Sequence, residues 1–448
     1  METTQLKAGR QIGLMALAFV VTTPGVILEL TVEHPQPILA AILFGAAIVG
    51  AAFMISWAAE IIQLDVGGGL ALAILALIAV LPEYAVDFVL TADAGREFAE
   101  TGAAERFGPL ALANMTGANQ LLIGFGWPLV ILLGTWRVRR TGVTPDRAEM
   151  ATSTTITLTR AQSVDIAYLA VASIYGMTLF LKETLSPLDA VILVAIYVAY
   201  MIRLSGATPE APHLVGPSAY VASLTKANRR AINYALFVLS ATVIVIVAEP
   251  FAESLIELGD EIGISEFLLL KWLAPFASEA PELLIASLFA WRLAARTGIG
   301  ALISSKVNQW TLLVGTLPIV FMIFAGQLHG LPLNEVQRDE LWVTATQSVF
   351  AVAIIASRSI SRKEAFAMLG LFIFQLAESW LAEIGVISED LSAGARIGVG
   401  VLFLLAAAWV LRDDFRRFGR VLRDGFRATW EELEAGEPQR AHGADQAP

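Results

Sequence analysis

The sequence predicts an all-α polytopic membrane protein of about 12 transmembrane helices, in which two inverted repeats of five helices carry one extra helix at each end. Three observations lead to this fold class: an apolar composition, the spacing of the apolar segments, and a motif that occurs twice. Of the 448 residues, 56% are hydrophobic and only 16% are charged. Soluble domains contain roughly 25% charged residues, so a soluble protein does not fit this composition.

Net charge and the rarer residue types exclude several classes of function. The net charge of −11 leaves no basic surface for nucleic acid. The chain has no cysteine, which excludes disulfides, iron–sulfur clusters and thiolate zinc sites. Its 4 histidines are too widely scattered to indicate a histidine metal site. We therefore expect no cofactor.

The number of membrane crossings follows from length, because about 30 Å of hydrocarbon takes roughly 20 apolar residues to cross as a helix. Candidate segments in the first half lie near 11–31, 37–62, 67–94, 108–136, 164–181 and 186–204. Those in the second half lie near 231–256, 264–293, 297–326, 341–357, 364–384 and 395–412. The first follows two basic residues, as a signal peptide does. No small-residue cleavage site follows it, so we interpret it as a retained helix.

The basic residues orient these segments. With the N-terminus inside, 23 of the 30 lysines and arginines fall on the inner side and 5 on the outer side, while Lys271 and Lys306 fall within spans. Cytoplasmic loops carry such an excess of basic residues. We therefore expect an integral protein of the plasma membrane with both termini cytoplasmic. Lys271, close to a helix end, is expected to reach toward the membrane surface.

The loops are short, so no separate soluble domain is expected. The chain divides into an N-terminal tail with the extra helix (1–36), a first repeat (37–204), a cytoplasmic connector (205–230), a second repeat (231–384), a last helix (385–412) and a cytoplasmic tail (413–448). The tail begins with basic and aromatic residues and then becomes polar. This pattern predicts an interfacial helix followed by a polar end.

A Pro-Glu pair occurs once in each repeat, at Pro82-Glu83 and Pro281-Glu282. The next apolar segment then contains Asn-Gln, at Asn119-Gln120 and Asn308-Gln309. The predicted topology makes the two Glu-bearing helices cross the membrane in opposite directions. An inverted repeat of this kind is typical of secondary transporters, whose sites lie at the bilayer midplane where the repeats meet.

Glu83 and Glu282 lie near the centres of their segments, where a charge costs at least about 2.5–3.5 kcal/mol and therefore indicates pairing or function. Proline interrupts helical hydrogen bonding and frees carbonyl oxygens. Carboxylate and carbonyl oxygens together suit Ca²⁺ or Na⁺. Asp87 follows Glu83 by four residues and shares its helix face. The alternative for all three acids is an internal ion pair that only holds the helices together.

This pair of motifs resembles the α-repeats of the cation/Ca²⁺ exchanger superfamily, to which sodium/calcium exchangers belong. The family pattern is approximately G-T-S-x-P-E followed by G-N-x-x-G-S-N, and ANMTGAN at 113–119 is similar to the second motif. The resemblance covers about 37–384. It implies a cation antiporter with Glu83 and Glu282 as central ligands and Asn119 and Asn308 on the facing helices.

The chain also departs from the family pattern. The hydroxyl pair before the first glutamate is Ala79-Val80, and before the second it is Ser278-Glu279. Lys306 replaces the glycine two residues before Asn308. Ligands for several Na⁺ ions are therefore depleted. Ser278 and Glu279 join the candidate ligands, and we expect Lys306 to be a charge partner of the site, paired with Glu279 either for function or as a structural ion pair.

The leading interpretation is a secondary active antiporter that exchanges Ca²⁺, or another cation, for Na⁺ or H⁺ by alternating access around the two glutamates. A Na⁺/H⁺ exchanger of the same fold is the alternative. A third possibility is a membrane protein that has kept the fold but lost its ion sites. An enzyme is not expected, because the chain has no His-Glu-x-x-His, no Gly-x-Gly-Asp and no Ser/His pair at membrane depth. The expected partners are inorganic cations and the lipid bilayer, and the oligomeric state cannot be read from the sequence.

Overall fold

The computed structural model describes residues 8–65, 81–207, 214 and 216–435, and helices dominate these residues. The first half contains α1 (Ala8–Thr31), α2 (Pro37–Ile62), α4 (Leu81–Thr101), α5 (Phe107–Leu121), α6 (Trp127–Thr141), α7 (Ser163–Gly176) and α8 (Pro187–Leu204). The second half contains α9 (Pro217–Ala222), α10 (Lys226–Ile262), α11 (Glu266–Trp291), α12 (Ala295–Asn308), α13 (Val314–Ala325), α14 (Glu335–Ile355), α15 (Arg362–Glu383), α16 (Glu389–Arg427) and α17 (Trp430–Glu434).

Among the described residues, 10 helical segments are long and apolar enough to cross a membrane. They correspond to ten of the twelve predicted segments, and the polytopic all-α prediction is confirmed. Of the other two, the segment at 67–94 lies partly outside the described residues and continues as α4, while that at 341–357 falls on α14. The boundary expected after residue 412 lies inside α16, which continues to Arg427 as one helix of 39 residues.

Two of the spans contain a π-helical turn at matching places. The turn η1 (Leu122–Gly126) joins α5 to α6, and η4 (Gln309–Leu313) joins α12 to α13. Each begins within three residues of its Asn-Gln motif. Single π turns inside α-helices often mark functional positions. Both halves of the chain therefore have the same local irregularity beside their asparagine.

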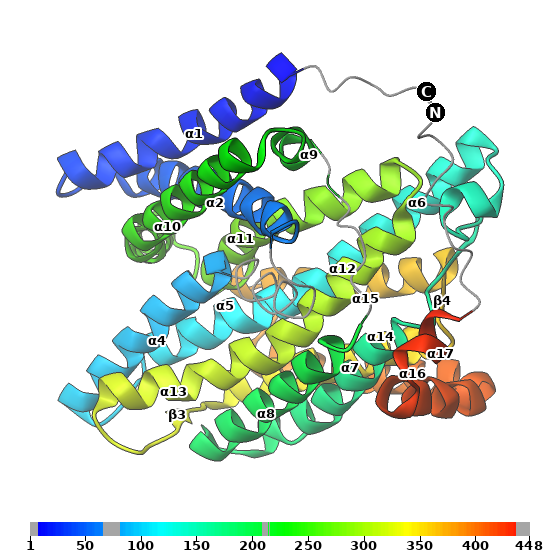
Figure 1. Cartoon of the computed structure of the whole chain (residues 1–448). Coiled ribbons are helices and arrows are strands. Elements are labelled where there is room, and N and C mark those ends of the chain that lie inside the picture. The colour runs from blue at the N-terminus through cyan, green and yellow to red at the C-terminus, as the bar shows by residue number, and fades with distance from the viewer. Residues whose placement is uncertain (1–7, 66–80, 208–213, 215, 436–448) are drawn as a thin grey trace.

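Contacts between the halves follow the symmetry expected of a repeat. Helix α2 packs on α10, the α5–α6 span packs on α11, and α4 packs on α13. Helix α6 contacts α15 in the same way as α13 contacts α8, and α7 contacts α14. In Figure 1, α1, α2 and α10 lie side by side along one edge of the bundle. The two Glu-bearing helices, α4 and α11, therefore both pack against the central spans of the opposite half.

Two short antiparallel strand pairs also join the halves. Strand β1 (Thr155–Thr157) pairs with β4 (Ser359–Ser361), and β2 (Thr184–Leu185) pairs with β3 (Leu331–Pro332). Helix α7 runs from β1 to β2, and α14 runs from β3 to β4, so the two strand pairs lie at opposite ends of the bundle. Figure 1 shows β3 and β4 at these opposite ends.

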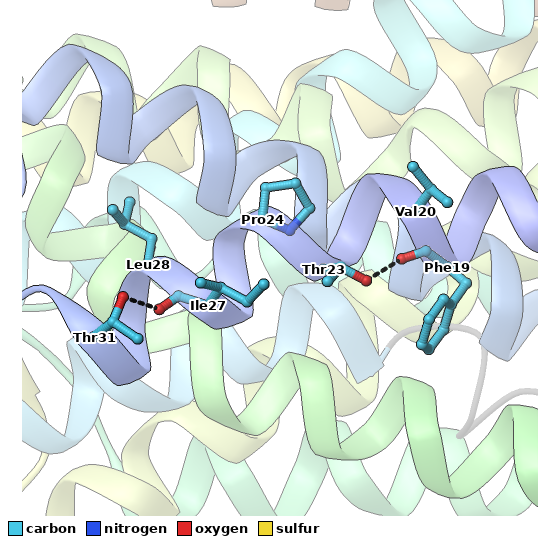
Figure 2. Close-up of a pocket in the computed structure, with 7 residues that line it drawn as sticks. All are labelled: Phe19, Val20, Thr23, Pro24, Ile27, Leu28 and Thr31. Atoms are coloured by element: carbon cyan, nitrogen blue, oxygen red, sulfur yellow. Dashed lines mark hydrogen bonds between the residues drawn. The ribbon is translucent and has the colours of Figure 1, made fainter.

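Helix α1 presents an apolar surface at the edge of the bundle. An open groove of about 610 Å³ along it is lined by seven residues, which Figure 2 shows. The hydroxyls of Thr23 and Thr31 donate to the carbonyl oxygens of Phe19 and Ile27, four residues earlier, at 2.8 and 2.6 Å. Because these hydroxyls are satisfied within the helix, the surface suits contact with lipid.

Candidate ion-binding site

Helix α4 supplies two buried carboxylates. Glu83 and Asp87 are each 1% exposed and lie one turn apart on the face that packs into the bundle. Pro82 directly precedes Glu83, and the residues before Leu81 lie outside the described part of the chain. Asn114 on α5 donates from Nδ2 to Asp87 Oδ1 at 2.7 Å. The Asp87 side chain is thus fixed by the neighbouring span, while residues 79–80, where the family has a hydroxyl pair, lie outside the described residues.

Helix α11 supplies Glu279 and Glu282. The helix continues through Pro275 and Pro281, so the interruption expected from proline does not occur in this half. Helices α5 and α10 pack against α11. Glu279 is fully buried and accepts a hydrogen bond from the Gln309 side chain of η4. Glu282 is less completely buried and lies beside Ser305 of α12.

The carboxyl groups of Glu83 and Glu279 lie next to each other, so one acid from each half meets at the centre. Their Oε2 atoms, and Oδ2 of Asp87, have no hydrogen-bond partner among the described residues. Buried oxygens normally find a partner, and two adjacent carboxylates repel each other unless a proton or a cation lies between them. The arrangement therefore suits exchange of protons and cations at one place.

The carboxylates do not form a closed metal cage in this conformation. Within the described part of the chain, no three histidine, cysteine or acidic side chains are grouped so that they could hold a metal ion. A cation bound here would also need neutral oxygens. Ser278 donates to the Pro275 carbonyl at 3.3 Å, and Asn308 is buried at the end of α12. Ser278 lies on α11 beside Glu279, whereas Asn308 lies on α12, the next helix along the chain.

Lys306 is fully buried, and its contacts differ from the expected pairing with Glu279. Its Nζ donates to Asn119 Oδ1 at 2.5 Å and to the Asn119 carbonyl at 3.3 Å, and it lies 4.7 Å from the ring centroid of Trp310. No direct ion pair with Glu279 occurs among the described residues. The nearer oxygens of Asn119 attract the ammonium, while Gln309 already occupies Glu279. A lysine of one half thus holds the motif asparagine of the other.

A second buried polar network adjoins this site and was not predicted. Lys271 and Glu340 form an ion pair of 2.7 Å, with side chains only 1% and 2% exposed. Gln120, the residue after Asn119, donates to Glu340 Oε2 at 3.1 Å and to the hydroxyl of Thr344 at 2.7 Å. Gln375 of α15 donates to Gln120 Oε1 at 2.6 Å.

The expectation that Lys271 reaches the surface is therefore wrong. Helix α14 already begins at Glu335, which brings Glu340 into the bundle opposite the lysine. One signal in the sequence points to this pair: Glu340 directly precedes the predicted span at 341–357, which is short and less apolar than the others.

The sequence pattern of the family described as sodium/calcium exchanger protein matches residues 36–206 and 232–381. The crystal structure of an H⁺/Ca²⁺ exchanger, CAX, is 35% identical with a TM-score of 0.82, over 96% of this chain and all 100% of that one. The native structure of YfkE is 15% identical with a TM-score of 0.56, over 80% of this chain and 98% of that one, and this likeness shows the fold alone.

The crystal structure of a selenium-substituted Ca²⁺/H⁺ antiporter protein, YfkE, has the same 15% identity and a TM-score of 0.57, over 81% of this chain and 98% of that one. No curated protein matches the chain. The family pattern covers well over half of the residues, and the apolar helices are those of an integral membrane protein. This chain belongs to the sodium/calcium exchanger protein family, whose members are cation antiporters.

Proposed function

We propose that this protein exchanges Ca²⁺ for H⁺, with Glu83 and Glu279 as the central pair and Glu282 and Asp87 beside them. The observation that carries the proposal is the meeting of two buried carboxyl groups from opposite halves, each with an oxygen that lacks a partner among the described residues. One Ca²⁺ can bridge such a pair, and protons can replace it. Asn119, Asn308 and Ser278 stand on the surrounding helices.

Exchange follows from competition for these oxygens. When the carboxyl groups are protonated they hold no cation, and when Ca²⁺ is bound the protons have left. Opening of the site to alternate sides of the membrane then couples the two movements in opposite directions. The counterion and the cargo therefore need only one site.

H⁺ is a better coupling ion than Na⁺ for this chain. The ammonium of Lys306 already occupies both oxygens of Asn119, which a sodium ion would otherwise use. The residues before the two motif asparagines are Ala118 and Val307, which offer no hydroxyl. The 35% identity to an H⁺/Ca²⁺ exchanger also supports this choice.

The test is ⁴⁵Ca²⁺ uptake into proteoliposomes that contain the full-length protein, driven in turn by a pH gradient and by a Na⁺ gradient. We expect uptake with the pH gradient alone. Glu83→Gln and Glu279→Gln should each lower the initial rate about 100-fold, because each removes a ligand and a proton carrier. Glu257→Gln is the matched control, since Glu257 is an exposed acid on α10, and its rate should remain unchanged.

Na⁺/H⁺ exchange is the second candidate, favoured by the lack of a three-ligand cluster among the described residues. Proton movement that depends on Na⁺, with no Ca²⁺ uptake under either gradient, would establish it and overturn the calcium proposal. No flux of any cation would instead indicate a protein that has kept the fold without transport. We place the protein in the plasma membrane with both termini in the cytoplasm, as the distribution of its basic residues favours.

A further inference from the structure

Strand β4 and helices α16 and α17 gather at one end of the bundle (Figure 1). A polar pocket lies there, away from the carboxylates. Its volume is about 400 Å³. Five arginines and one aspartate line it, together with a serine and a valine: Arg160, Arg358, Arg417, Arg420, Arg423, Asp424, Ser357 and Val421. The lining thus carries a large excess of positive charge, which requires an explanation.

The protein itself neutralises only part of this charge. Arg160 holds Asp424 with both ends of its guanidinium, at 2.9 and 3.2 Å, and donates to the Glu432 carbonyl at 2.8 Å. The single carboxylate of the pocket is therefore already occupied. The side chains of Arg358 and Arg420 make no hydrogen bond or ion pair with any described residue. Their two guanidinium groups therefore remain for a ligand, while Arg423 is exposed and contacts Asp424 only at 3.8 Å.

The backbone of Arg358 is held in an unfavourable conformation at this place. Its φ of 58° is in the left-handed region, which a residue with a side chain rarely adopts. Two hydrogen bonds fix it there, from its N–H to the Ile355 carbonyl at 2.9 Å and from the Leu158 N–H to its carbonyl at 2.8 Å. Burial lowers the pKa of Arg358, against the attraction of Asp424. Such strain is kept where the position of a side chain matters.

The pocket lies level with the ends of spanning helices. Arg160 precedes α7 by three residues and Arg358 follows α14 by three. The apolar part of α16 ends at Arg412, and Arg417 lies roughly 8 Å beyond it at 1.5 Å per residue. Lipid headgroups occupy about 5–8 Å on each side of the hydrocarbon core. The pocket therefore begins at the depth of the headgroups, and Arg420 and Arg423 lie farther along α16, at roughly 12 and 17 Å from Arg412.

An apolar strip lies on α16 before the pocket, and Arg412 and Arg416 follow it on the way to Arg420. Leu405 and Trp409 are 62% and 71% exposed. Trp409 and Arg420 are eleven residues apart, which places them on the same side of a helix that has 3.6 residues per turn. Acyl chains that lie along Leu405 and Trp409 would bring a headgroup to Arg420.

We propose that this arginine pocket binds the phosphate of an anionic phospholipid, with Arg358, Arg420 and Arg423 as its ligands. The planar guanidinium group presents paired donors that match phosphate oxygens. Basic pockets between spanning helices are a recurrent form of headgroup site. A soluble phosphate has the same chemistry, but the depth of the pocket and the apolar strip favour the lipid.

The test is native mass spectrometry of the full-length protein in neutral detergent, titrated with phosphatidylglycerol or with phosphatidylcholine. We expect one tightly retained phosphatidylglycerol and no comparable phosphatidylcholine. The exposed pair Arg420→Gln/Arg423→Gln should bind it about thirtyfold more weakly, at about 1 kcal/mol per arginine and 1.4 kcal/mol per tenfold change. The matched control is Arg139→Gln/Arg140→Gln, which removes the same charge from the exposed last turn of α6 outside the pocket, and its affinity should stay within about twofold.

Two outcomes would overturn the proposal. Equal weakening by both double variants would show that only the general charge of the surface attracts the lipid. Binding of inorganic phosphate alone, with displacement of phosphatidylglycerol by millimolar phosphate, would assign the pocket to a soluble anion. Both double variants replace exposed arginines, so we expect both proteins to fold and their lipid affinities to be directly comparable.

Discussion

The buried ion pair between Lys271 and Glu340 gives a prediction of definite size. At 2.7 Å and an effective dielectric constant of about 20, the attraction between the two charges is about 6 kcal/mol. Removal of one partner from such a pair usually costs about 3–5 kcal/mol, because the other charge stays buried alone. We therefore expect Lys271→Met or Glu340→Gln to lower the free energy of unfolding by about 4 kcal/mol.

The double variant Lys271→Met/Glu340→Gln isolates the interaction energy between the two charges from the effect of each single change. Glutamine at 340 still accepts the hydrogen bond from Gln120, and methionine fills the space of the lysine stem. With both charges gone, the loss should fall to about 1–2 kcal/mol, which leaves a coupling energy of about 6–7 kcal/mol. The measurement is reversible unfolding in mixed SDS micelles, followed by tryptophan fluorescence. The exposed pair of Arg96 and Asp93 is the control, and its coupling should be below about 1 kcal/mol.

A coupling energy below about 1 kcal/mol for Lys271 and Glu340 would refute the reasoning. It would mean that the interior at this place is hydrated enough to accept either charge alone. Transport gives a second readout. Because Gln120 links the pair to the span that carries Asn119, the single variants should also slow ⁴⁵Ca²⁺ uptake more than the double variant does.

Three further predictions follow from other contacts. Gly117→Ala should prevent recovery of folded protein, because its Cβ would lie 1.7 Å from the carbonyl oxygen of Lys271, whereas Gly370→Ala, with nothing within 4 Å, should be harmless in size-exclusion chromatography. Lys306→Met should make ⁴⁵Ca²⁺ uptake sensitive to competing Na⁺, because the oxygens of Asn119 become available to a sodium ion. Unchanged sensitivity to Na⁺ would contradict the idea that the Lys306 ammonium takes the place of Na⁺. The hydrogen bond from Arg160 lowers the pKa of Asp424, so their pair stabilises the fold above about pH 4 and ceases to do so as the pH falls through the lowered pKa. Asp424→Asn should therefore cost about 1 kcal/mol at pH 7 and little near pH 3 in a thermal melt.

The helices could be predicted from the sequence because any helix that lipid surrounds must carry apolar side chains on its surface. Helices α1, α8 and α16 expose most of their apolar residues, and hydropathy located each of them well. Hydropathy identified helix α14 less well. Its neighbours α5, α7 and α16 shield it from lipid, so it carries buried Glu340, Thr344 and Gln347 and reads as only weakly apolar.

The members of the candidate site could be named from the sequence, but not their contacts. Glu83, Glu282 and the asparagines stood out because a repeated motif placed polar groups at membrane depth. The choice of Asn119 as the partner of Lys306 depends on how two spans from opposite halves approach each other. No local pattern in the sequence encodes that approach, and the same holds for the adjacency of Glu83 and Glu279.

The two strand pairs have a consequence for the biogenesis of this protein. Strand β1 is complete at residue 157, but its partner β4 is complete only at residue 361. At about 5–20 residues per second, the ribosome makes the intervening chain in about 10–40 s. During that time the first half is already in the membrane, with its strands unpaired and its central carboxylate without a counterpart. Insertion and completion of the fold are therefore separate events in time, and only the second brings Glu83 and Glu279 together.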